Sequence, residues 1–160
     1  MFDITLIAIG KLKEKFYLSA AEEYAKRLKA YCNFQILELP EQRLPDDPSP
    51  AEIAAGLEKE ASLIEARIPR GAWLCVLTPE GKMLSSEAFA ETLAGVKLSG
   101  KSSACFLIGS SYGIAPRIKQ AADLRVSMGP MTFPHHLARV MVLEQLYRAE
   151  SIQAGSKYHK

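Results

Sequence analysis

Apolar and polar positions along the chain follow two periods, and segments of one period alternate with segments of the other. Residues 2–10, FDITLIAIG, form an apolar run rich in β-branched residues that ends in glycine, which is typical of a buried strand. From residue 14 to 31 the apolar residues recur every three or four positions opposite charged ones, so this segment predicts an amphipathic helix. Residues 34–40 alternate again and predict a second strand.

The remainder of the chain repeats this order of strand and helix. Ser49, Pro50 and Glu52 have the pattern of a capping box with proline at the first helical position, which predicts a helix ending near Arg67. The segments 72–81, 103–113 and 123–133 are each expected to be a strand that runs into a turn or loop, and helices are expected at 85–98, 115–122 and from 134 onward. Because strands and helices alternate, we expect one α/β domain spanning residues 1–160, with a mostly parallel sheet flanked by helices.

Composition narrows the class of protein. No apolar run approaches the ~20 residues that a membrane span needs, and the N-terminus lacks a basic leader region, so we expect a cytoplasmic protein with no membrane segment. Cys32, Cys75 and Cys105 lack metal-ligand spacing and are expected to be reduced, buried thiols. The formal net charge of +2 falls within residues 134–160, which points mildly to an anionic partner there.

Three loops follow predicted strands: TPEG at 78–81, GSSYG at 109–113 and SMGPMT at 127–132. In open parallel sheets, ligands bind beyond the carboxyl ends of the strands, so these loops form the expected site. Neither the dinucleotide fingerprint nor the P-loop pattern is present, and GSSYG does not match the nucleophile elbow of serine hydrolases. Small residues and apolar side chains in these loops suit an uncharged aromatic ring such as adenine.

The segment MTFPHHLARVMVLEQLYRA, residues 131–149, predicts a helix that starts beside two histidines. His135 and His136 would point about 100° apart, which does not suit a shared metal ion, so we predict no metal site and interpret them as residues that open the helix. Glu144 and Arg148 are spaced for an ion pair, with a direct role in substrate handling as the alternative. The broad apolar face of this helix indicates burial against the domain and a second subunit.

The chain resembles a known family in FLIGSSYGI, in MTFPHHLARVMVLEQLYRA and in the terminal YHK. Taken with the strand order, these segments are similar to the SPOUT-class ribosomal RNA large subunit methyltransferase H family over essentially the whole chain. The resemblance implies a C-terminal trefoil knot, S-adenosylmethionine as methyl donor, no metal, and a homodimer. It also implies methylation of N3 of a pseudouridine in 23S rRNA, with the ribosome as partner.

The resemblance also assigns site residues by position. Cofactor contacts are expected from the loops that the strand pattern selects: Leu77, Gly109, Met128, Gly129, Pro130, Met131, Thr132 and Phe133. Many relatives have a second glycine where Ser110 stands. The residues expected to hold RNA or stabilise charge on the uracil ring are Arg139, Arg148, Tyr158 and His159.

Two matters stay open at the level of sequence. The group that removes the N3 proton is not determined, and a non-catalytic ribosome-binding or assembly protein with the same fold is the alternative function. The tail SKYHK, residues 156–160, has the composition of a solvated chain end, although the resemblance gives Tyr158 and His159 a role.

Overall fold

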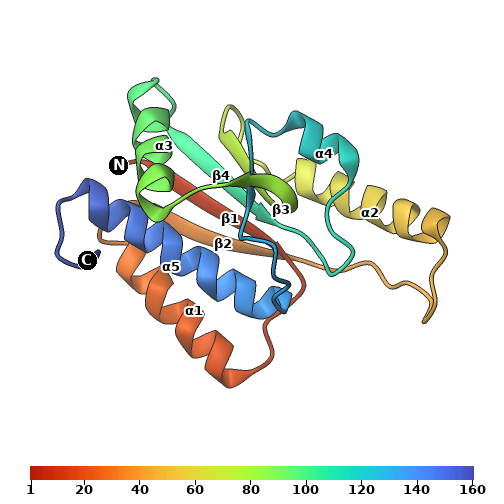
Figure 1. Ribbon diagram of the computed structural model, residues 1–160. Coiled ribbons are helices and arrows are strands. Elements are labelled where there is room, and N and C mark those ends of the chain that lie inside the picture. The colour runs from red at the N-terminus through yellow and green to blue at the C-terminus, as the bar shows by residue number, and fades with distance from the viewer.

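Five strands form one sheet in the computed structural model, which describes residues 1–160 (Figure 1). Their order across the sheet is β2-β1-β4-β3-β5, and each pair of neighbouring strands runs parallel. The strands are β1 Asp3–Ile9, β2 Asn33–Leu39, β3 Trp73–Met83, β4 Ser103–Ile108 and β5 Leu124–Ser127. The α/β fold with a mostly parallel sheet, expected from the alternation of periods, is confirmed.

The helices follow the strands in the predicted order. They are α1 Lys15–Leu28, α2 Pro50–Glu65, α3 Ser86–Leu98, α4 Pro116–Ala121 and α5 His135–Gln153. The capping box of α2 is present, since the Ser49 hydroxyl accepts from the Glu52 backbone N–H and the Glu52 carboxylate accepts from the Ser49 N–H. No helix is both long and apolar enough to cross a membrane.

An apolar core lies on each face of the sheet. Every residue of β4 is buried, as expected for the middle strand of a parallel sheet. Its side chains alternate: Phe106 and Ile108 belong to the core under α1, α3 and α5, and Cys105 and Leu107 belong to the core under α2 and α4. Figure 1 shows these two groups of helices on opposite faces, so α5 and the C-terminal tail share one layer with α1 and α3.

The cysteines are buried free thiols, as predicted. Cys32, Cys75 and Cys105 form no disulfide, and burial raises the pKa of each thiol to about 12. At neutral pH these thiols are therefore protonated and behave as small apolar core residues.

The strand β3 is longer than the pattern of apolar residues indicated. It pairs in register with β4 as far as Leu77, which lies opposite Ile108 on one side and Val126 of β5 on the other. The register then shifts, and Lys82 again lies opposite Val126. Residues 78–81, predicted as a turn after the strand, therefore form an irregular bulge within it.

Candidate functional site

The carboxyl ends of β4, β3 and β5 lie next to one another at one edge of the sheet. Leu77 is level with Ile108 and Val126, the last or nearly last residues of the flanking strands. The bulge at 78–81 and the loops at 109–113 and 127–132 therefore leave the sheet from one edge. This is the arrangement that the strand pattern predicted for a ligand site.

A cavity of about 590 Å³ opens beside this edge. Its walls come from the end of β3 and the segment after it, from α3, from the end of β5 and from α5, and most of its lining residues are apolar. Of the predicted cofactor residues, Leu77, Met128 and Gly129 line the cavity, and the others do not. Gly109 is buried at the end of β4, while Phe133 is half-buried and residues 130–132 are exposed on the loop before α5.

Two glycines at this edge occupy positions that a larger residue would not fit. A Cβ added at Gly109 would lie 2.4 Å from the carbonyl oxygen of Gly113, because the loop turns tightly back on itself. Gly129 has a φ of +113°, a backbone conformation that residues with a Cβ rarely adopt. Gly109 therefore allows the loop to close on itself, whereas Gly129, with nothing within 4 Å of the place of a Cβ, presents bare backbone to the cavity.

Thr78 adds a polar atom without a partner. The residue is 5% exposed, and its Oγ1 makes no hydrogen bond within the chain. A buried hydroxyl without a partner costs about 1–3 kcal/mol, and Thr78 follows Leu77 in β3 without itself lining the cavity. An apolar cavity with a few polar groups beside it is typical of a site for a small molecule that contains a ring.

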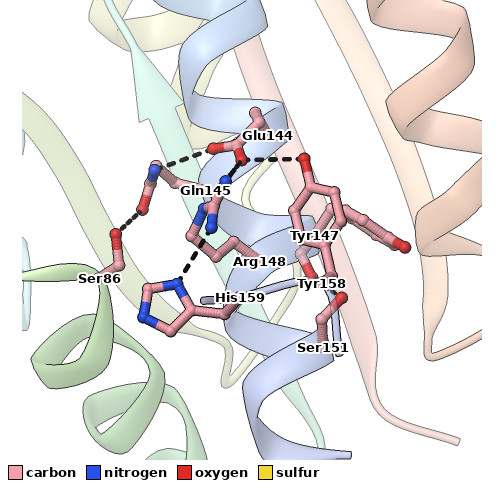
Figure 2. A network of polar contacts seen from close by, with 8 residues as sticks. All are labelled: Ser86, Glu144, Gln145, Tyr147, Arg148, Ser151, Tyr158 and His159. Carbon is pink, nitrogen blue, oxygen red and sulfur yellow. Dashed lines mark hydrogen bonds and ion pairs between the residues drawn. The ribbon is translucent and has the colours of Figure 1, made fainter. Parts of the chain in front are cut away.

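A polar network forms part of the cavity wall and joins α5 to the C-terminal tail (Figure 2). Glu144 is at its centre: one carboxylate oxygen accepts from Arg148 Nε at 2.9 Å and from the Tyr158 hydroxyl at 3.1 Å. The other oxygen accepts from Gln145 Nε2 at 2.9 Å, and Gln145 in turn accepts from Ser86 Oγ at 2.7 Å. Because Ser86, Glu144 and Gln145 also line the cavity, the network faces the candidate ligand site.

His159 is held between Arg148 and α3. Arg148 Nη1 lies 3.0 Å from His159 Nδ1, and since a guanidinium only donates, Nδ1 accepts this hydrogen bond. The ring proton is then on Nε2, which donates to Glu87 Oε1 at 2.8 Å. Both ring nitrogens are engaged, so His159 has no free lone pair with which to take a proton in this arrangement.

Arg148 and Tyr158 both keep their protons at neutral pH. Burial is the main cause that raises the pKa of Tyr158 to about 12, and Glu144 adds to it. The hydrogen bond from Arg148 to Glu144 raises the pKa of the guanidinium, which also lies 4.8 Å from the centre of the Tyr158 ring. The network therefore offers a cation at Arg148 and a carboxylate at Glu144, whose oxygens already accept from Arg148, Tyr158 and Gln145.

The expected ion pair between Glu144 and Arg148 is confirmed. The prediction of a solvated tail from the composition of SKYHK is wrong, because Tyr158 and His159 bond to Glu144, Arg148 and Glu87. These partners lie on α5 and α3, so the tail packs across two helices and joins the site.

Arg139 stands apart from the other three residues predicted to contact RNA. Its side chain is 2% exposed, and Nη1 lies 2.6 Å from Glu38 Oε2 while Nη2 donates to the carbonyl oxygen of Gly10 at 2.9 Å. Gly10 and Glu38 lie at the carboxyl ends of β1 and β2. Arg139 thus fastens the first turns of α5 to the sheet, whereas Arg148, Tyr158 and His159 come together beside Glu144, which lines the cavity.

The paired histidines lie in the first turn of α5, as interpreted from the sequence. His136 Nδ1 is 3.3 Å from Glu14 Oε2, and His135 is half-buried, which lowers its pKa. Both line a second, polar cavity with Lys11 and Lys13, away from the polar network of α5. No group of three or more histidine, cysteine, aspartate or glutamate residues is arranged to hold a metal ion.

Sequence reasoning did not single out Ser86, Glu87 or Gln145. The sequence predicted a helix over 85–98, and the structure shows that Ser85 caps α3 by accepting from the Ala88 N–H at 3.0 Å. Ser86 is therefore free to bond Gln145. Nothing in the sequence indicates the bond between Ser86 and Gln145 apart from the second serine at the start of α3, because Gln145 lies 59 residues further along the chain.

Comparison with known proteins gives full-length matches. A sequence model of the family described as "Predicted SPOUT methyltransferase" matches residues 2–159. A ribosomal RNA large subunit methyltransferase H of Moorella thermoacetica is 45% identical over 160 residues, covering 100% of both chains. The protein of the same name from Ligilactobacillus salivarius is 42% identical over 158 residues, covering 99% of each chain.

Solved structures share the fold at low sequence identity. A tRNA (m1G37) methyltransferase of Aquifex aeolicus has a TM-score of 0.52 and 14% identity, covering 91% of this chain and 69% of its own. A "Probable Methyltransferase" of Bordetella pertussis has a TM-score of 0.53 and 15% identity, covering 92% of this chain and 95% of its own. At such identities the likeness concerns the fold alone. Together with the full-length sequence matches, it leads to one conclusion: the chain belongs to the SPOUT methyltransferase family.

Proposed function

We propose that this chain methylates N3 of a pseudouridine in 23S rRNA of the large ribosomal subunit, with S-adenosylmethionine as the methyl donor. The observation that carries the proposal is the apolar cavity beside the glycine loops, whose wall includes Glu144. Arg148 and Tyr158 bond to Glu144 from behind that wall, and His159 bonds to Arg148. The names of the full-length relatives support ribosomal RNA as the substrate. A non-catalytic ribosome-binding or assembly protein is not favoured, because those relatives are named as methyltransferases.

The residues at the edge of the sheet fit S-adenosylmethionine. The cofactor supplies a methyl group on a sulfonium, which is reactive enough that the protein needs no nucleophile of its own. Leu77, Met128 and Gly129 would give the adenine ring an apolar wall with accessible backbone. The remaining proposed contacts are Gly109 at the end of β4 and Pro130, Met131, Thr132 and Phe133 on the loop before α5.

The polar network fits the chemistry at the RNA base. N3 of the ring must lose its proton before it attacks, so a nearby cation stabilises the anionic ring that results. Arg148 is the residue proposed for this role, and the Tyr158 hydroxyl, which donates to Glu144, supports its ion-pair partner. His159 accepts from Arg148 and thereby orients the guanidinium. The proton itself passes to solvent or to an RNA group in this proposal, since both nitrogens of His159 and both oxygens of Glu144 are engaged.

Assembly and location complete the proposal. Leu137, Val140 and Met141 on α5 are apolar and only half-buried, which supports a homodimer with its second subunit against this helix. Membership of the family supports a trefoil knot formed by the C-terminal part of the chain. An enzyme that acts on ribosomal RNA works where ribosomes are, so we place the protein in the cytoplasm.

Isothermal titration calorimetry of the purified protein with S-adenosylmethionine tests the cofactor assignment. We expect one ligand per chain, and weaker binding by Gly129→Val, because valine cannot adopt the φ of +113° without strain. Absence of binding by the wild-type chain would overturn the proposed function. The alternative function predicts that ribosome binding survives in the Gly129→Val variant while the RNA gains no methyl group from either protein.

A further inference from the structure

The glycine loop at 109–113 is attached to the protein through an acidic residue of another element. Ser110 is 8% exposed, and its hydroxyl donates to Glu60 Oε1 at 3.0 Å. Ser111, on the exposed side of the loop, donates to Glu41 Oε1 at 3.3 Å. Gly113 N–H donates to the Ser110 carbonyl at 2.9 Å and closes the turn. Ser110 is therefore the buried anchor of a loop that otherwise faces solvent.

Glu60 belongs to α2, on the opposite face of the sheet from α5. It is 3% exposed, and its second oxygen, Oε2, accepts from the backbone N–H of Gln42 at 2.9 Å. The segment after β2 lies directly on α2 here, since a Cβ on Gly56 would come within 2.9 Å of Leu44. One carboxylate thus ties the glycine loop, α2 and the segment after β2 together.

An ionised carboxylate is energetically unfavourable at this buried position. None of the ion pairs in the chain includes Glu60. The charged residue that acts electrostatically on its pKa is Glu41, which is also acidic. Burial is the main cause that raises the pKa of Glu60, and the two donated hydrogen bonds oppose it. A buried charge without a cation costs stability, so the presence of Glu60 here is explained by the two segments that its hydrogen bonds hold together and not by a gain in stability.

We infer that Glu60 is a positioning residue for the cofactor site: by accepting from Ser110 and Gln42, it holds the glycine loop in the shape that admits the methyl donor. Gly109 shows that this loop conformation leaves little space, because the Gly113 carbonyl oxygen lies 2.4 Å from where a Cβ on residue 109 would be. The inference rests on the proposed function for the identity of the ligand. It also gives the Ser110 hydroxyl a role, as the link from the glycine loop to α2.

The test compares Glu60→Ala, Glu60→Gln and the control Glu65→Ala in the full-length protein. Glu65 is an acidic residue of the same helix, but its carboxylate contacts Arg117 of α4 and not the glycine loop. Calorimetry measures S-adenosylmethionine affinity, circular dichroism the melting temperature, and hydrogen exchange the protection of amides 109–113. Ser110→Ala, which removes only the hydroxyl, replaces Glu60→Ala if that variant does not fold.

We expect Glu60→Ala to weaken binding by about tenfold, the loss of one buried hydrogen bond, and to speed amide exchange in the loop. Glu60→Gln should restore affinity to within about threefold, because its amide accepts from Gln42 and donates to the Ser110 oxygen. Glu65→Ala should match the wild type. A lower melting temperature of Glu60→Ala with unchanged affinity and unchanged exchange would show a merely structural role and overturn the inference.

The hydrogen-exchange measurement separates this inference from the proposed function. If the wild-type chain binds no S-adenosylmethionine, the proposed function fails. The amide hydrogen exchange of residues 109–113 then tests by itself whether Glu60 positions the glycine loop. Faster exchange of amides 109–113 in Glu60→Ala than in Glu65→Ala supports the positioning role. Equal exchange in the two variants overturns it.

Discussion

Arg148 donates to Nδ1 of His159 across 3.0 Å, and this contact assigns the ring proton of His159 to Nε2. The guanidinium is thereby fixed on both sides, by Glu144 within α5 and by the penultimate residue of the chain. A cation held this firmly next to Glu144 of the cavity wall costs little reorganisation when negative charge develops beside it. In the proposed function, the tail therefore orients Arg148 for the reaction and leaves the proton transfer to another group.

Arg148→Ala should slow methyl transfer by about 100-fold, the usual effect of removing one preorganised charge-stabilising donor. S-adenosylmethionine affinity should be unchanged, because Arg148 is not among the residues that line the cavity. Single-turnover methylation and calorimetry measure the two quantities. Arg117→Ala, which removes an arginine paired with Glu58 and Glu65 elsewhere, is the matched control.

The double variant Glu144→Ala/Arg148→Ala separates two roles of Arg148. If the guanidinium only neutralises Glu144, removal of both charges restores the rate. If it stabilises the anionic ring, the double variant stays as slow as Arg148→Ala. We expect the second result, and recovery to within about threefold of the wild-type rate would contradict it, since a lost donor costs far more.

Tyr158→Phe tests whether the phenol acts as a donor or as a base. The pKa of Tyr158 is raised to about 12, so folding favours the protonated phenol. The associated stability is fully present below the ordinary tyrosine pKa near 10 and is lost as pH rises through about 12. We expect a rate loss of less than about tenfold and an unchanged profile of rate against pH from about 6 to 9. Loss of an alkaline limb in that profile would assign the proton transfer to Tyr158.

Glu60→Gln should raise the melting temperature at neutral pH. Burial raises the pKa of Glu60, so the folded chain binds this proton more tightly than the unfolded chain does. The resulting stability is complete below the ordinary glutamate pKa of about 4.3 and is lost as pH rises through the raised value. The advantage of glutamine should therefore shrink as pH falls from 7 toward 4 in thermal unfolding experiments. An advantage that grows toward low pH would contradict the assignment.

Arg139→Ala should destabilise the fold and leave RNA contacts alone. Removing one partner of a buried ion pair costs about 3–5 kcal/mol, and we expect about 2–3 kcal/mol here. The expected loss of stability is smaller than for a fully buried pair because the Glu38 side chain is 39% exposed and is hydrated once Arg139 is removed. Urea denaturation measures the loss. A direct RNA contact would instead change the salt dependence of ribosome binding, which we expect to be the same in wild type and variant.

Local pattern was sufficient for the elements and for the place of the ligand loops. The period of the apolar residues predicted each strand and helix, and parallel strands bring their carboxyl ends to one edge. Pattern was insufficient where contacts join distant parts of the chain. Arg139 is paired with a residue 101 positions away, and His159 with one 72 positions away. Neither pairing leaves a trace in periodicity, so the buried role of Arg139 and the docked tail required the structure.

The central claim is tested most directly by methyl transfer to ribosomal RNA with purified components. Large ribosomal subunits from cells that lack the gene are incubated with the protein and isotopically labelled S-adenosylmethionine, and the rRNA nucleosides are then analysed by mass spectrometry. The account predicts one new labelled nucleoside, a pseudouridine methylated at N3, and its absence with Arg148→Ala over the same time. No label in the rRNA, from free RNA or from assembled subunits, in a protein that binds S-adenosylmethionine would contradict it.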